Sequence, residues 1–165
     1  MQGKHIRLPL LAVLLSLAAC ASFEERLAGW EQDSRTAGRP VLVYGVESSA
    51  PTAGLALANT GTKAVTGLSV TLRPYAKGSP AGDAQAFDLS PALPAGGIAP
   101  GATFNARWNT DLRTADCFRV SGLALSFAGG SNASIGEKDM DDYFAPVVNK
   151  HCTRAAAYAA PSGGY

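Results

Sequence analysis

Two cysteines, Cys117 and Cys152, and the neighbouring His151 are residue types that could do chemistry. They could form a disulfide, a redox pair or part of a metal site. The chain has no CxxC motif, and one histidine with two distant cysteines makes a poor zinc site. We therefore expect a structural disulfide, with a metal or redox pair as the alternative. Closing a loop of about 36 residues would stabilise the fold by on the order of 4 kcal/mol in the chain-entropy model.

The acidic segment 137–142, with sequence EKDMDD, is the second candidate. Asp139 and Asp141 have the spacing of the first two ligands of a calcium loop, but the required glycine and the final glutamate are missing. We expect a solvated loop here, with a weak Ca²⁺ site as the alternative. The turn segments 77–82 and 129–142 form a candidate contact surface. Asp139, Asp141 and Asp142, within the second segment, form the candidate contact loop.

Recognisable catalytic motifs are missing from the rest of the sequence. There is no G-x-S-x-G elbow, P-loop or dinucleotide fingerprint. His151, which lies beside the expected disulfide, is the only histidine after residue 20. The formal net charge of +1 gives no electrostatic reason to expect nucleic acid as a partner. We expect no enzyme activity, no cofactor and no metal.

Residues 1–20 have the organisation of an export signal. Lys4 and Arg7 form a positive start, and a mostly apolar run follows over residues 8–17. This run of about ten residues is too short to span a membrane stably, but it is typical of a secretory signal. The sequence Leu17-Ala18-Ala19-Cys20 then resembles the lipobox of bacterial lipoproteins.

The lipobox resemblance implies that residues 1–19 are removed as a signal peptide and that Cys20 carries lipid, including palmitate. Two or three acyl chains would give a stable membrane anchor. Ala21 and Ser22 follow Cys20, where an aspartate would favour inner-membrane retention. The resemblance therefore implies an outer-membrane lipoprotein that faces the periplasm. An ordinary secretory signal with a chance cysteine is the alternative.

The best helix candidate lies directly after this motif, over residues 22–33. Ser22 and Glu25 have capping-box spacing, and Phe23, Leu27 and Trp30 recur on one helical face. We expect this face to pack on the folded domain; the bilayer surface is the alternative.

From residue 40 onward, short alternating segments are separated by turn residues. Expected strands span 40–48, 53–59, 65–75, 84–89, 103–109, 118–127 and 143–152. About seven such strands are typical of an immunoglobulin-like β-sandwich. The stretches LALANTGTKAVTGLSVTLRPYAKGSPAG and IAPGATFNARW resemble bacterial fibronectin-type envelope modules. Cys117 would begin one strand and Cys152 would end the next, so antiparallel pairing would bring them together.

The sequence therefore predicts an all-β protein, an immunoglobulin-like β-sandwich preceded by a signal peptide and one short helix. Its 165 residues suit one domain with a real core. We expect a signal peptide over 1–19, an anchor, helix and tether over 20–39, the sandwich over 40–152 and a disordered tail over 153–165. This organisation favours a non-enzymatic binding or assembly module, tethered to the membrane through Cys20 and contacting an envelope protein. The alternatives are an accessory subunit of an envelope enzyme or secretion/efflux complex, or an envelope enzyme without a recognisable motif.

Overall fold

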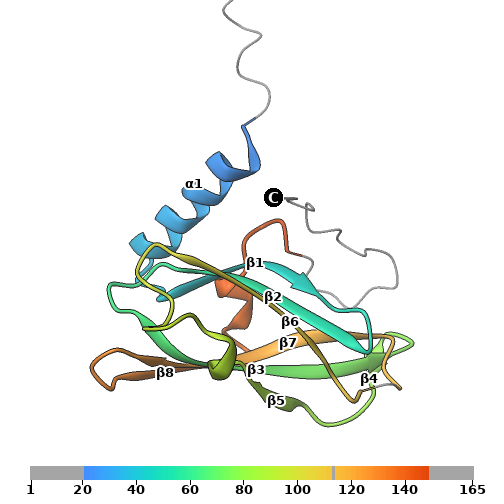
Figure 1. Ribbon diagram of the computed structural model, residues 1–165. Coiled ribbons are helices and arrows are strands. Elements are labelled where there is room, and N and C mark those ends of the chain that lie inside the picture. Colours follow the sequence, from blue (N-terminus) through green and yellow to red (C-terminus); the bar gives the residue numbers. More distant parts are fainter. Residues whose placement is uncertain (1–20, 113, 149–165) are drawn as a thin grey trace, which may run out of the picture.

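Two antiparallel β-sheets form the body of the protein in a computed structural model, which describes residues 21–112 and 114–148 (Figure 1). The three-stranded sheet has the order β1 (Val41–Glu47), β2 (Thr52–Asn59), β6 (Thr103–Asn109). The five-stranded sheet has the order β4 (Ser79–Pro80), β3 (Val65–Ala76), β7 (Cys117–Phe127), β8 (Asn132–Ile135), and β5 (Gln85–Asp88) also pairs with β3. The chain crosses between the sheets after β2, β5 and β6, as in an immunoglobulin-like sandwich.

The core lies between the two sheets and follows from the alternation of side chains along each strand. On β3, Leu68, Val70 and Leu72 are buried, whereas the residues between them are half-buried. Opposite them, Leu55 and Leu57 of β2 are also buried. The predicted all-β sandwich is therefore confirmed.

Six of the seven expected strands are confirmed to within a few residues, and the seventh is wrong over its described part. Tyr143 ends a short 3-10 helix, η3 (Met140–Tyr143), and Phe144 makes a single parallel bridge to Val43 of β1. No strand follows over 145–148, where Pro146 lacks the N–H that a ladder needs. Residues 149–152 lie outside the described part of the chain.

Two short strands lie in segments that are predicted to be turns, and a second 3-10 helix lies just after the expected strand 84–89. β8 lies inside the segment 129–142, where it pairs with β7. β4 lies inside the segment 77–82 and forms a tight hairpin with the end of β3. The 3-10 helix η2 (Ser90–Ala92) follows β5 directly.

Helix α1 (Phe23–Thr36) has the predicted capping box and is three residues longer than expected at its C-terminal end. Its N-terminus is fixed because the Ser22 hydroxyl accepts a bond from the Glu25 N–H, while the Ser22 N–H donates to the Glu25 carboxylate. The helix packs against β1, above the three-stranded sheet (Figure 1). Trp30 is among its half-buried residues, so packing on the domain is confirmed. None of the described helices has the length and apolar character needed to cross a bilayer.

Candidate functional site

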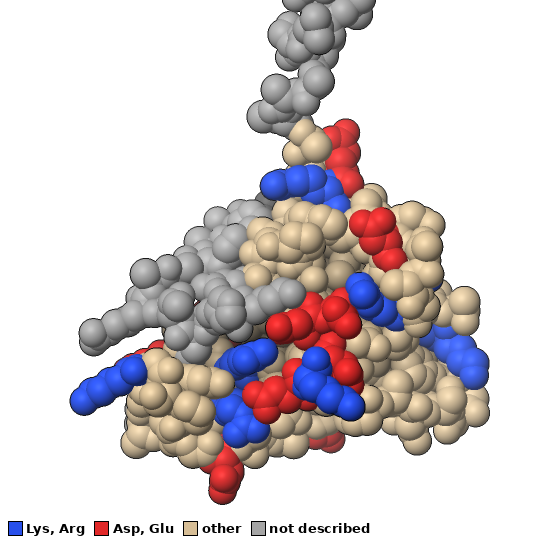
Figure 2. All heavy atoms as spheres, turned by 180° about the vertical axis from the view of Figure 1, so that it is seen from behind, with Lys and Arg blue, Asp and Glu red and all other residues tan. Residues whose placement is uncertain are grey.

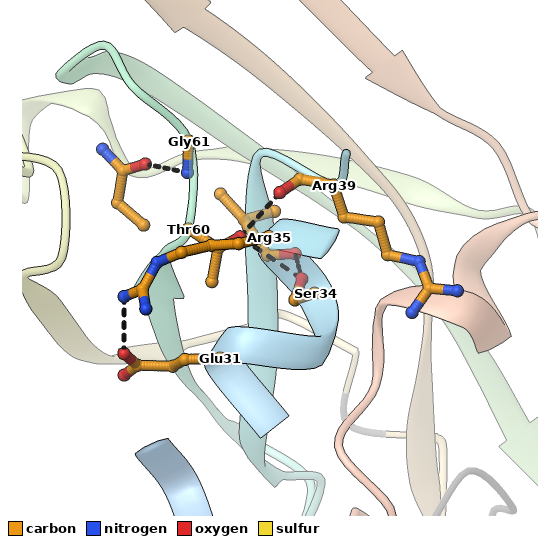
Figure 3. Close-up of polar contacts among 8 residues, drawn as sticks. Glu31, Ser34, Arg35, Arg39, Thr60 and Gly61 are labelled. Atoms are coloured by element: carbon orange, nitrogen blue, oxygen red, sulfur yellow. Dashed lines mark hydrogen bonds and ion pairs between the residues drawn. The ribbon is translucent and has the colours of Figure 1, made fainter. Parts of the chain in front are cut away.

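The junction between α1 and the three-stranded sheet is a buried polar contact (Figure 3). Ser34 and Thr60 are 1% and 4% exposed, and their hydroxyl oxygens lie 3.3 Å apart. The Thr60 hydroxyl donates to the Arg39 carbonyl at 2.7 Å, and the Ser34 hydroxyl donates to the Val41 carbonyl at 3.4 Å. The last turn of α1 is thus attached to the start of β1 and to the turn after β2. The helix next to the predicted lipid is an integral part of the domain.

The outer face of the three-stranded sheet carries the N-terminal half of α1. Leu42 is only 3% exposed although it points away from the core side, where its neighbours Val41 and Val43 are buried. On the same outer face, the Tyr44 hydroxyl donates to the Asn105 side chain of β6 at 3.4 Å. The Phe23 ring at the start of α1 lies 6.2 Å from the Tyr44 ring. These contacts place α1 over the outer face of this sheet.

The acidic segment predicted as a contact loop folds back onto two arginines of the same chain. Arg73 of β3 and Arg119 of β7 are directly opposite each other in the five-stranded sheet. Arg73 forms an ion pair with Glu137 at 2.8 Å, and Arg119 forms one with Asp141 at 3.3 Å. The hydrogen bond and charge of Glu137 raise the pKa of Arg73. The carboxylates therefore offset the repulsion between two neighbouring guanidinium groups.

The two other predicted contact residues of this segment lie at the surface. Asp139 and Asp142 are exposed, and neither forms an ion pair with a described residue. Within the described part of the chain, no group of three or more His, Cys, Asp or Glu side chains could hold a metal ion. The view from behind in Figure 2 shows acidic and basic side chains intermingled in the lower part of the molecule.

The turn segments 77–82 and 129–142 do not form one continuous surface. Segment 77–82 follows the end of β3, which lies beside the start of β7, whereas the turn 128–131 follows the end of β7. The eleven residues of β7 separate these turns by about 35 Å at the usual rise per residue. Within segment 129–142, only the acidic part from Glu137 onward lies near Arg73 of β3. The register of the sheet, which the sequence did not reveal, decides this separation.

A shallow hollow of about 430 Å³ lies on the outer face of the five-stranded sheet. Small residues line most of this hollow, because the outward-facing side chains of β3, β7 and β8 around it are no larger than asparagine. They include Gly67, Ser69, Ser90, Ala124, Ser126, Asn132 and Ser134.

Ser90 lines this hollow and is hydrogen-bonded to the neighbouring Asp88. The Ser90 hydroxyl and N–H donate hydrogen bonds that lower the pKa of Asp88. The same hydroxyl oxygen accepts from the Leu68 N–H at 3.1 Å. The sequence analysis does not predict this surface, although small residues at alternate positions of the expected strands indicate it.

Cys117 begins β7 as predicted and is half-buried opposite Tyr75, with a bridge to Ser49. Cys20, Cys152 and His151 lie outside the described residues, so the lipid anchor and the disulfide stay predictions. Trp108 packs beside Phe87, with ring centroids 6.1 Å apart, at the edge of the core. No known family model matches this chain, and no curated protein is similar to its sequence.

Proposed function

We propose that this protein is an envelope lipoprotein, a non-enzymatic binding or assembly module tethered through Cys20 at the outer membrane and facing the periplasm. The lipobox resemblance supports the tether. Only Ala21 separates Cys20 from the Ser22 cap of α1, and α1 is attached to the sandwich at its far end. The fourteen helical residues span about 21 Å. The anchor is therefore joined to the domain by a packed helix, not by a long linker.

The position of α1 is the observation that carries the proposed orientation. Because α1 packs on β1 at the outer side of the three-stranded sheet, an anchor at its N-terminus lies on that side of the molecule (Figure 1). The five-stranded sheet then turns its outer face away from the membrane. The shallow hollow lies on this face, and the acidic segment, with its exposed Asp139 and Asp142, lies beside β7, where it contacts both sheets. We propose this face as the surface that meets an envelope protein.

The proposal includes a disulfide between Cys117 and Cys152. An exported domain with one lipidated cysteine leaves two cysteines to pair in an oxidising compartment. The position of Cys117 at the first residue of β7 supports this pairing. Cys117 is bridged to Ser49, just after β1, and the chain after η3 returns to β1 through the bridge between Phe144 and Val43. We infer that the bridge closes this end of the sandwich.

Replacing the lipidated cysteine tests the tether. Cys20→Ser should move the protein from the membrane fraction to the soluble fraction and abolish palmitate labelling. Ser22→Ala is the matched control, because it removes the helix cap but keeps the lipobox, so membrane association should persist. A Cys20→Ser protein that stays in membranes and labels like the parent would show that the anchor assignment is wrong.

Charge reversal on the outer face tests the binding role. Asp139→Lys with Asp142→Lys should weaken capture of a cross-linked envelope partner while leaving the melting temperature unchanged, because both side chains are exposed. Glu24→Lys, on the exposed side of α1, is the control and should capture normally. Unchanged capture by the double variant, together with an enzymatic activity lost in His151→Ala, would favour the enzyme alternative.

A further inference from the structure

The outer edge of β6 is the longest uncovered strand edge in the described part of the chain. β6 pairs with β2 along one side, and no described residue forms a backbone hydrogen bond to its other side. The opposite edge of the same sheet is covered in part, because the Ala145 N–H donates to the Val43 carbonyl of β1. The seven residues of β6 contain no proline or lysine, residues that natural proteins often use to protect such edges.

Hydrogen bonds at the two ends of β6 identify which backbone groups are free. The Asn59 N–H donates to the Ala102 carbonyl, and the Thr110 N–H donates to the Pro51 carbonyl. Since bonded and non-bonded pairs alternate in an antiparallel ladder, Phe104, Ala106 and Trp108 are the β6 residues that bond to β2. The intervening residues therefore present their N–H and C=O groups at the free edge. They are Thr103, Asn105, Arg107 and Asn109.

We propose that two copies of this chain pair antiparallel along β6, about a two-fold axis that passes at Ala106. In this register Asn105 of one copy lies opposite Arg107 of the other, and Thr103 lies opposite Asn109. All four free residues then form bonded pairs with their counterparts, which gives about eight hydrogen bonds. The two sheets of three strands become one continuous sheet of six.

The side chains along the free edge select this register, and they allow a second copy to pair without opposing charges. An axis at Arg107 would place two guanidinium groups directly opposite each other, and an axis at Asn105 would leave Asn109 unpaired. The Arg107 guanidinium already donates two hydrogen bonds to the Glu47 carboxylate of its own chain. The edge thus offers an amide opposite a neutralised arginine, and no uncompensated charge opposes association.

The position of α1 is compatible with this pairing. A two-fold axis between antiparallel strands of one sheet is normal to the sheet, so both outer faces turn the same way. Phe23 and Tyr44 place α1 on that outer face, and hence both helices rise from the same side of the six-stranded sheet. This step rests on the proposed tether, since two anchors on one side reach one membrane. Tethering would also raise the local concentration of the copies.

Cross-linking between two differently tagged full-length copies tests the register. In a bonded antiparallel pair the Cα atoms are about 5.5 Å apart, within the range of a disulfide. Asn105→Cys in one copy and Arg107→Cys in the other should therefore form a reducible dimer that carries both tags. Copies of one variant alone place their new cysteines about 8–9 Å apart, so they should give several-fold less dimer. Thr103→Cys with Asn109→Cys is the second pair, for use if the first fails to accumulate.

Three results would overturn the pairing: no mixed dimer with either cysteine pair, equal dimer from single variants, or cross-linking to a different protein instead. Asn105→Pro should abolish the mixed dimer formed by the 103–109 pair, because proline removes an N–H at the free edge and none that bonds to β2. Asn105→Ala, which keeps that N–H, is the matched control and should retain the dimer. Fractionation of the same cells tests the tether separately, since a mixed dimer in the soluble fraction would support the pairing and contradict the lipid anchor.

Discussion

Gly97 holds the connection before β6 against the start of β3, and its replacement by alanine should be unusually damaging. Gly96 and Gly97 are neighbours with almost equal positive φ angles, +82° and +83°. A Cβ on Gly96 would meet nothing within 4 Å, whereas a Cβ on Gly97 would lie 2.2 Å from the Val65 carbonyl oxygen. The two substitutions share the backbone strain and differ in the collision, so Gly96→Ala is a matched control.

The expected loss of stability follows from what the collision must break. The strain of a left-handed alanine costs about 1–2 kcal/mol at either position. Relief of the collision at Gly97 requires the chain to move away from Val65, which exchanges two backbone hydrogen bonds with Ile98. Each bond contributes about 1 kcal/mol, and withdrawing the buried Ile98 side chain costs a further 1.5–3 kcal/mol or so. Gly97→Ala should therefore lower the free energy of unfolding by about 4–7 kcal/mol.

Urea unfolding of the two variants beside the parent chain measures this difference. Gly96→Ala should shift the midpoint modestly, while Gly97→Ala should remove a large share of the 5–15 kcal/mol or so that is typical of a whole domain. Where the Gly97 variant is too unstable to purify, its accumulation relative to the Gly96 variant gives the same ranking. Equal losses in the two variants would refute the reasoning, because strain alone would then account for both.

Three further predictions concern the junction, the disulfide and the rim of the hollow. Thr60→Val should lower the free energy of unfolding by about 1–3 kcal/mol, since it leaves the partly buried Arg39 carbonyl without its donor, and Thr60→Ser, which keeps the hydroxyl, should cost less in the same urea titration. Reduction of the proposed Cys117–Cys152 bridge should lower the free energy of unfolding by about 2–5 kcal/mol and thereby lower the melting temperature. Alkylation of both thiols in the unreduced protein would contradict the bridge. Hydrogen bonds from Ser90 lower the pKa of Asp88, so this carboxylate stabilises the fold above its unfolded pKa and loses that effect as the pH falls through its folded pKa. The difference in melting temperature between the parent and Asp88→Asn should therefore shrink as the pH falls below about 4; a constant difference would contradict this reasoning.

The sequence predicted the elements whose pattern is local. The alternation along β3 and β7 identifies strands because one face of each is buried against the opposite sheet. The capping box at Ser22 and Glu25 identifies the start of α1 because its two hydrogen bonds join residues only three apart. Such signals need no knowledge of the rest of the chain.

The elements that were wrong or missed depend on distant partners. β8 has four residues and one buried side chain, Ile135, so its strand character comes mainly from pairing with β7. The apolar residues of the expected last strand are buried through a 3-10 turn and a single bridge to β1, and apolar composition alone does not distinguish that from a strand. The ion pair between Arg73 and Glu137 joins residues 64 apart, which no local pattern reveals.

The proposed surfaces occupy different parts of the sandwich, and this separation constrains how they could work together. The anchor helix and the β6 edge belong to the three-stranded sheet, whereas the hollow lies on the other sheet and the acidic segment contacts both sheets. Pairing along β6 would therefore leave both outer binding faces open and place them side by side, turned away from the membrane. A partner with two matching sites would then bind the pair more tightly than one copy, without any new contact. Asn105→Pro lies on β6, at the opposite edge of the three-stranded sheet from the bridge between Phe144 and β1. It should consequently weaken capture of such a partner, as the double variant Asp139→Lys with Asp142→Lys should; undiminished capture by the Asn105 variant would show that single copies suffice.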